Sequence, residues 1–179
     1  LIKCRRICEK KSRGLIVDSA ERQGVQEKLV ASLLKGDQQN FYFPEGVLGF
    51  STCQRFTLSR YQPADESESP FFLLQAVNAN LSFPLISPHL LVTDYQLPLP
   101  PDTLIKLATD TMNDLVALAI VTLRPRLEEI TANLQGPVLF NPIARLGLQV
   151  IAERYSVRHP ILHPQPTTKK KSRGPTKRR

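Results

Sequence analysis

The feature that most constrains the fold is a series of short apolar or alternating runs from residue 40 onward, each ended by turn-forming residues. Many residues in the runs are β-branched or aromatic, as in the short strands of an all-β domain. The fifteen prolines agree, because proline sits at strand ends and turns and is excluded from central ladders. We therefore predict strands at 40–43, 55–61, 71–77, 81–86, 115–123, 137–140 and 148–152.

The patterns of three segments predict one fully buried strand and two short helices. The run 115–123 is rich in Val, Ile and Leu and stops at Arg124-Pro125, which favours a strand buried on both faces. In 24–36, apolar residues recur at helical spacing before a glycine that could end a helix. In 100–108, a proline entry and an N-cap at Asp102 or Thr103 predict a second short helix.

The glycine-rich string FPEGVLGF at 43–50 raises the question of a phosphate-binding loop. Its glycine spacing matches no nucleotide-binding motif, and no helix start follows that could present backbone amides to a phosphate. Pro44-Glu45-Gly46 instead predicts a tight turn, since proline fixes φ and glycine accepts a positive φ. The expected core residues around this turn and beyond it are Phe43, Phe50, Phe71, Leu74 and Ile120.

The net charge of +8 is concentrated at the two ends of the chain. Residues 1–14 carry six Lys/Arg and one acid, and residues 165–179 carry seven and none, whereas residues 40–164 carry eight against eleven. A nucleic-acid-binding domain usually has a basic face on its folded part. We therefore expect no direct nucleic-acid binding by the folded domain, whose body is mildly acidic.

The chain divides into three parts by composition. Residues 1–39 form an N-terminal extension that contains the first expected helix, 40–164 form the β domain, and 165–179 form a polybasic tail. The tail has no large apolar residue and is expected to be disordered. The longest apolar run is far shorter than the roughly 20 residues of a membrane helix, and no signal peptide is visible. These patterns predict a cytoplasmic protein without membrane association.

No catalytic or metal-binding motif stands out. The chain lacks a nucleophile elbow, a P-loop and a dinucleotide fingerprint. His159 and His163 are four apart, but a proline follows each and argues against a helix that would hold zinc. The cysteines form no ligand set: Cys4, Cys8 and Cys53. We expect no catalytic, metal or cofactor site, and a domain that works by binding another protein.

Six strings in a fixed order carry a family resemblance. They are FPEGVLGF at 43–50, PFFLLQAV at 70–77, LSFPLISP at 81–88, LAIVT at 118–122, TANLQGP at 131–137 with Asn141-Pro142 after it, and RYSVRHP at 154–160. In this order and at these spacings, over about residues 40–162, they closely resemble the FliW family of flagellar assembly factors. Residues 1–39 and the basic tail are not part of the resemblance.

The resemblance implies a fold and a partner switch. The fold is a compact β-barrel-like domain of short antiparallel strands with one or two short helices. Family members bind newly made flagellin in the cytoplasm; when flagellin is scarce, they bind the translational regulator CsrA and relieve its repression of flagellin synthesis. No catalysis and no cofactor are implied. Regulators of the CsrA type are basic, so an acidic body would complement them.

Residues for partner contact are chosen by charge and by place in the strings. Asn133 and Asn141 are read first as residues that satisfy backbone groups or fix turns, with partner contact as a second role. The full set of partner-binding candidates is Asp65, Glu66, Glu68, Glu128, Glu129, Asn133, Asn141 and Arg158. An alternative function is that of an RNA- or ribosome-associated protein acting through its basic termini.

Overall fold

The computed structural model describes Val30, Leu33, residues 38–63 and residues 69–162. The expected helix at 24–36 lies largely outside this part, although Val30 and Leu33 are both helical. The polybasic tail at 165–179 lies outside it completely. No helix in the described ranges is both long enough and apolar enough to cross a membrane.

Strands dominate the described residues, which confirms the all-β prediction. Their bounds are β1 Gln38–Tyr42, β2 Arg55–Arg60, β3 Phe71–Ala76, β4 Ser82–Ile86, β5 Val116–Thr122, β6 Thr131–Asn141, β7 Leu146–Gln149 and β8 His159–Pro160. The first five agree with the predicted runs to within two residues or so. The prediction for β6 was too short, because 137–140 is only the second half of an eleven-residue strand.

The strands close into a seven-strand barrel. Their order is β5-β4-β3-β2-β1-β7-β6, and pairing of β5 with β6 completes the ring, while β8 lies along the first part of β6. The neighbours pair in antiparallel fashion except at one seam, where β1 and β7 run parallel and share the single pair Tyr42–Leu146. There the Tyr42 N–H donates a 2.9 Å hydrogen bond to the Arg145 carbonyl. The seam between β1 and β7 is therefore the shortest strand contact in the ring.

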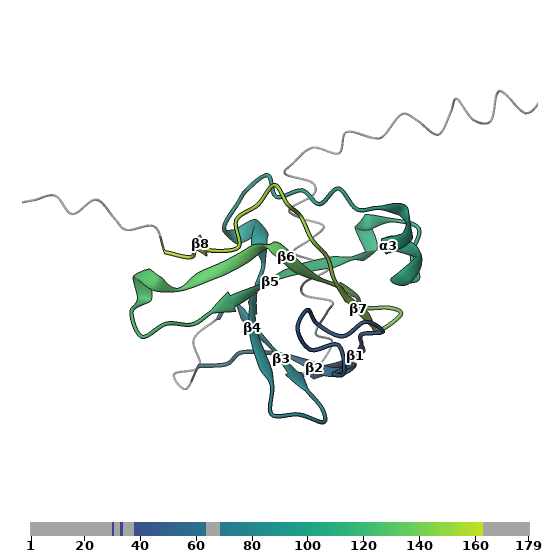
Figure 1. Cartoon of the computed structure of the whole chain (residues 1–179), viewed down its shortest axis with the longest axis horizontal. Coiled ribbons are helices and arrows are strands. Elements are labelled where there is room, and N and C mark those ends of the chain that lie inside the picture. Colours follow the sequence, from purple (N-terminus) through teal and green to yellow (C-terminus); the bar gives the residue numbers. More distant parts are fainter. Residues whose placement is uncertain (1–29, 31–32, 34–37, 64–68, 163–179) are drawn as a thin grey trace, which may run out of the picture.

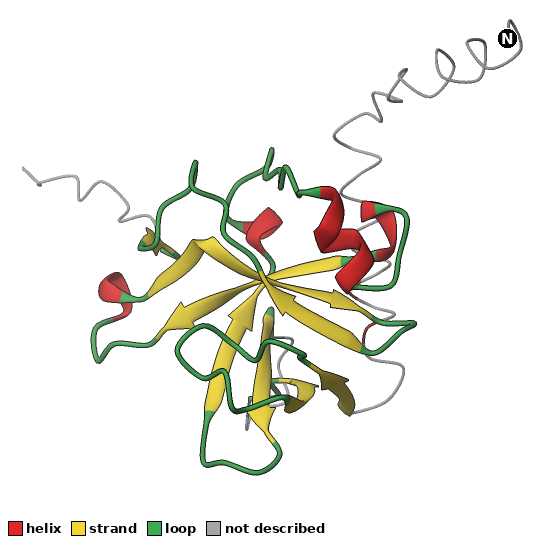
Figure 2. Cartoon of the chain, turned by 45° about the vertical axis from the view of Figure 1, so that its right-hand side comes forward, coloured by secondary structure: helices red, strands yellow, loops and turns green. Residues whose placement is uncertain are grey.

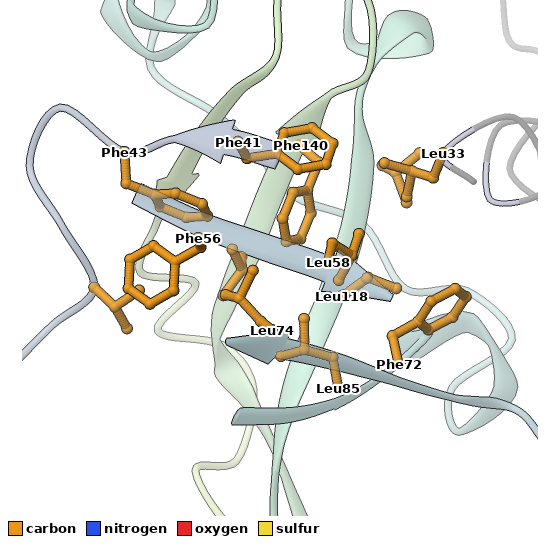
Figure 3. Packing of buried hydrophobic residues seen from close by; sticks show 13 residues of the cluster. Leu33, Phe41, Phe43, Phe56, Leu58, Phe72, Leu74, Leu85, Leu118 and Phe140 are labelled. Atoms are coloured by element: carbon orange, nitrogen blue, oxygen red, sulfur yellow. The ribbon is translucent and has the colours of Figure 1, made fainter. Parts of the chain in front are cut away.

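The barrel interior is an apolar core of phenylalanine, leucine and valine side chains (Figure 3). Phe43 packs edge-to-face on Phe56 and on Phe140, with ring centroids 5.0 and 5.8 Å apart, and Phe41 packs on Phe140 at 5.0 Å. Such pairs contribute about 0.5–1.5 kcal/mol each beyond the area they bury. Leu33 joins this core and is completely buried, so a residue from before β1 belongs to the packed domain.

A second layer covers the outer face of β5 and β6. The segment that follows β4, residues 87–99, and the segment 150–161 pack on this face around Tyr95, Ala119 and Leu134. Figure 1 shows these two stretches crossing over β5 and β6. Because β5 is covered inside by the core and outside by this layer, its residues from Val116 to Ala119 are all buried. The prediction of a strand buried on both faces is confirmed.

The short helices lie outside the crossing strands (Figure 2). The α-helix α3, Pro101–Lys106, confirms the helix predicted at 100–108. Its predicted cap was wrong: the N-cap is Pro100, without a side-chain hydrogen bond, and Asp102 lies inside the first turn. The other helices between β4 and β8 are single 3-10 turns, η1 Pro88–Leu90, η2 Met112–Asp114 and η3 Leu127–Glu129.

The string at 43–50 forms the predicted turn. The Gly46 N–H donates to the Phe43 carbonyl at 3.0 Å, and Gly46 has a φ of 68°. A Cβ at this position would lie 2.5 Å from the Phe50 carbonyl oxygen, so only glycine fits. Phe43 is buried as expected, but Phe50 is 41% exposed and lies outside the core because it follows the turn on the surface.

Of the other expected core residues, Leu74 is completely buried. Phe71 and Ile120 are partly buried and pack against the edges of two different apolar clusters. The sequence could not distinguish such an edge position from the centre, because both show the same strand alternation.

Candidate protein-binding surfaces

The predicted contact residues fall into three groups in the structure. Asp65, Glu66 and Glu68 lie outside the described residues, between β2 and β3. Glu128, Glu129 and Arg158 are exposed. Asn133 and Asn141 have side chains committed to hydrogen bonds within the domain.

Both asparagine side chains form hydrogen bonds with backbone groups, Asn133 near the start of β6 and Asn141 at its end. Asn133 accepts a 2.9 Å hydrogen bond from the Gly136 N–H, within the same strand. Asn141 is 2% exposed: its Nδ2 donates to the Leu107 carbonyl at 2.7 Å, and its Oδ1 accepts from the N–H groups of Ile143 and Ala144. A partner cannot reach a buried side chain whose hydrogen bonds are already made. The first reading, as residues that satisfy backbone groups and fix turns, therefore describes both, and Asn141 is removed from the contact candidates.

Glu128, Glu129 and Arg158 are far apart in sequence but lie at one end of the barrel. The two acids belong to η3, in the connection between β5 and β6. Arg158 directly precedes β8, whose His159 pairs with Ala132 of β6. The Ile161 N–H also donates to the Ile130 carbonyl at 3.2 Å, so the two segments lie side by side. They are seen together at the left of Figure 1.

Exposed apolar side chains lie in the same two segments as these charges. Leu127 is 62% exposed in η3 and Val157 is 52% exposed beside Arg158. The β8-end surface is defined by both kinds of residue: Leu123, Leu127, Glu128, Glu129, Val157, Arg158 and Leu162. Sequence reasoning missed its apolar members. A signal was present for one of them, since Leu127 stands alone between charged residues in a run too short to form a strand.

The β8-end surface and the neighbouring Arg124 and Arg126, together called the β8-end region, carry both positive and negative side chains. Arg126 and Glu129 form an exposed ion pair with 3.8 Å between Nη1 and Oε1. Such a pair contributes about 0–1 kcal/mol at most, so it orients the connection only weakly. A surface of large apolar residues rimmed by charges of both signs is typical of a protein-binding site.

A cavity of about 330 Å³ lies under the segment 95–98, against the outer face of β5 and β6. Apolar side chains, Leu97, Leu115 and Leu139 among them, form much of its lining, and Arg154 stands among its polar groups. Leu97 packs against the apolar cluster around Tyr95 and also against the apolar cluster around Leu107. The cavity therefore lies between these two clusters. The small side chain of Ala117 in its lining leaves this space open.

His89 and Tyr95 lie together in the same lining, with ring centroids 5.8 Å apart. Burial lowers the pKa of His89, so the imidazole is held in its neutral form. Burial, and to a smaller degree the neighbouring Tyr155, raise the pKa of Tyr95. The Tyr95 hydroxyl donates a 2.7 Å hydrogen bond to the Leu134 carbonyl. These two groups therefore stay neutral near pH 7 and serve the packing of the outer layer.

Metal ligands do not gather anywhere in the described ranges, where no group of three or more His, Cys, Asp and Glu residues could hold an ion. His159 lies in β8 rather than on a helix, and His163 lies outside the described residues. Cys53 is a half-buried free thiol, while Cys4 and Cys8 also lie outside.

Comparison with known proteins gives a consistent result. The family model described as "FliW protein" matches residues 23–161, and so begins within the segment 1–39. The flagellar assembly factor FliW of Carboxydothermus hydrogenoformans is 36% identical over 79% of this chain and 89% of its own. The flagellar assembly factor FliW of Natranaerobius thermophilus is 35% identical over 74% and 85%.

A solved structure agrees with these sequence matches. A crystal structure of the flagellar assembly factor FliW superposes with a TM-score of 0.58 at 31% identity. The superposition covers 68% of this chain and 82% of that one. The similarity therefore extends over the barrel and is not limited to one motif.

Proposed function

The chain belongs to the FliW family of flagellar assembly factors, and on that premise we propose that it works as a partner switch. It binds flagellin and, when flagellin is scarce, binds the translational regulator CsrA and relieves the repression of flagellin synthesis. The proposed site of action is the cytoplasm. The switch works by binding alone, without catalysis and without a cofactor.

The observation that carries this proposal is the β8-end surface. Glu128 and Glu129 lie in η3 next to the exposed Leu127, and Arg158 lies next to the exposed Val157 on the segment that pairs with the start of β6. Large apolar anchors with a charged rim are what a protein partner needs, because the anchors supply affinity and the rim supplies specificity. The acidic residues Asp65, Glu66 and Glu68 remain further proposed contacts.

Charge supports a protein partner over RNA for the folded domain. The described residues 38–63 and 69–162 carry eight Lys/Arg and eight Asp/Glu, so they have no overall positive charge. The alternative function, RNA or ribosome association through the basic termini, would depend on residues 1–14 and 165–179. Deletion of both residues 1–14 and residues 165–179 separates the two: RNA binding that survives in the shortened chain contradicts a domain that avoids nucleic acid.

The main test is titration calorimetry of the full chain with purified flagellin and with purified CsrA. We expect both to bind, and we expect flagellin to displace CsrA when both are present. If neither protein binds at micromolar concentration, the proposed function is wrong even though the family assignment stands.

A surface variant locates the contact. Leu127→Ser with Val157→Ser removes two exposed apolar side chains of the β8-end surface and should weaken binding of at least one partner about tenfold or more. The matched control is Val77→Ser, whose side chain is 53% exposed on the turn between β3 and β4. Equal binding by the double variant and the control would remove the β8-end surface from the proposal.

A further inference from the structure

The opposite end of the barrel carries a second exposed apolar region. It is built from the turn after β1, from α3 and from the turn between β6 and β7, seen at the right of Figure 1. Since β6 has eleven residues, roughly 30 Å separates this end from β8. We call it the α3-end surface; its large apolar members are Tyr42, Leu48, Ile105 and Ile143.

Two isoleucines dominate this surface. Ile143 is 83% exposed and Ile105 is 78% exposed, more than any other large apolar residue of the described ranges. Water contact of a full isoleucine side chain is unfavourable by about 1.5–3 kcal/mol relative to burial. Neither residue contributes to a core cluster, so the fold itself does not explain them.

Contacts within the domain join the segments that present these side chains. Asn141 links the turn between β6 and β7 to the end of α3 through the Leu107 carbonyl. The Lys106 ammonium lies 2.8 Å from a Glu45 carboxylate oxygen and so joins α3 to the turn after β1. The Leu48 N–H donates a 2.9 Å hydrogen bond to the Gln149 side chain. The three segments are therefore linked to one another, most strongly through the buried Asn141.

Backbone strain is concentrated at the same end. All four residues of the described ranges with a positive φ lie here: Gly46, Gly49, Ala108 and Arg145. Two of them are not glycine, and a left-handed conformation is unfavourable for such residues by roughly 1–2 kcal/mol. Strained positions of this kind cluster at functional sites, where a specific shape is required.

The rim of the α3-end surface is acidic. Half of the eight described acids lie around it, namely Glu45, Asp102, Asp110 and Asp114. Two of the eight described basic residues lie there, Lys106 and Arg145, and Lys106 already pairs with Glu45 at 2.8 Å and with Asp102 at 4.0 Å. The β8-end region differs, because Arg124, Arg126 and Arg158 there outnumber Glu128 and Glu129.

From these observations we infer that the α3-end surface docks a basic protein that presents apolar side chains between its Lys and Arg residues. Ile105 and Ile143 enter the partner's apolar surface, while Asp102 and Asp110 attract its positive charge. Within the proposed function, on which this assignment rests, the basic partner is the CsrA-type regulator.

The first experiment removes the apolar anchors without adding charge. In the full chain, Ile105→Ser with Ile143→Ser is titrated with CsrA and with flagellin by calorimetry. The affinity for CsrA should fall about tenfold or more, since both side chains are lost from the centre of the contact. Val77→Ser is the control and should bind as the unchanged chain does.

The second experiment tests the acidic rim. Asp102→Asn with Asp110→Asn keeps the size of both exposed side chains and removes two negative charges. The association rate with CsrA at low salt should fall several-fold, and the rate should depend less on salt than that of the unchanged chain. Because both positions are exposed, the thermal transition by circular dichroism should stay in place and exclude unfolding as the cause.

The outcomes separate this inference from the proposed function. If the unchanged chain binds neither CsrA nor flagellin, the proposed function fails. If it binds both, and the isoleucine and aspartate variants bind CsrA like the control, the inference is overturned while the proposed function stands. Loss of CsrA binding with retained flagellin binding supports the α3-end surface as the site of the basic partner; equal loss of both supports it as a shared site.

Discussion

Asn141 donates a 2.7 Å hydrogen bond from Nδ2 to the carbonyl oxygen of Leu107, and this contact fixes α3 to the far end of β6. The same side chain accepts from the N–H groups of Ile143 and Ala144 through Oδ1. One buried amide therefore holds together two of the three segments that form the α3-end surface.

We expect Asn141→Ala to lower the free energy of unfolding by roughly 2–4 kcal/mol, because buried backbone groups lose their partners. Urea denaturation of the full chain measures this loss. Asn113→Ala is the matched control, since the Asn113 side chain is exposed in η2, and its change should stay within about 0.5 kcal/mol. A similar small change for Asn141→Ala would contradict the role assigned to this residue.

The sequence predicted the elements of the barrel well where local patterns determine them. β2, β3, β4 and β5 follow from alternating or continuous apolar runs between turn residues, and α3 follows from its proline entry. The turn at Gly46 also follows, because proline and glycine act through their own backbone preferences.

The surfaces could not be predicted in the same way, because they depend on contacts between distant segments. Arg158 comes to lie beside β6 only through the pairing of β8 with that strand, which residues 159–160 alone are too short to announce. Ile105 lies on α3, and the sequence does not show that the turn carrying Ile143 ends beside this helix. Phe50 looks like a core residue in sequence, yet it is exposed because the turn directs the chain onto the surface.

The hydroxyl group of Tyr95 supports the outer layer, and its removal should be measurable. Tyr95→Phe leaves the buried Leu134 carbonyl without its 2.7 Å donor and should lower the free energy of unfolding by about 1–3 kcal/mol at pH 7. Thermal denaturation measures the change. Tyr61→Phe, at an exposed position, is the control and should be nearly neutral.

The pH dependence of stability gives an independent test of Tyr95. Its pKa is raised by burial, so the folded state holds the phenol proton more strongly than the unfolded state does. The resulting stabilisation is complete below the unfolded pKa of about 10 and is lost as the pH rises toward the folded value. Above about pH 10, stability should therefore fall less steeply in Tyr95→Phe than in the unchanged chain. Identical slopes would show that this phenol is not buried as described.

A substitution at Gln39 should raise the free energy of unfolding, whereas the changes at Asn141 and Tyr95 should lower it. Its side chain faces inward from β1 and is 8% exposed, and its Oε1 has no hydrogen-bond partner among the described residues. A buried acceptor without a partner is unfavourable by roughly 1–3 kcal/mol. Gln39→Met keeps a similar volume and should raise the free energy of unfolding by about 1 kcal/mol, measured by urea denaturation. Clear destabilisation would mean that this amide makes a contact essential to the fold.

The parallel seam of the barrel depends on Gly147, which lies in β7 directly against the Phe43 ring. A Cβ at position 147 would overlap that ring, so Gly147→Ala should destabilise the domain by about 1–3 kcal/mol through overpacking. Phe43→Leu alone should also destabilise, by roughly 1–3 kcal/mol, because it leaves space among Phe56 and Phe140.

The double variant distinguishes overpacking from a general weakness of β7. In Phe43→Leu with Gly147→Ala, the smaller side chain makes room for the added methyl group, so the combined loss should be smaller than the sum of the two by at least about 0.5 kcal/mol. Urea denaturation of all four proteins completes the cycle. Strict additivity would mean that the close approach of Phe43 is not what makes a larger residue at position 147 unfavourable.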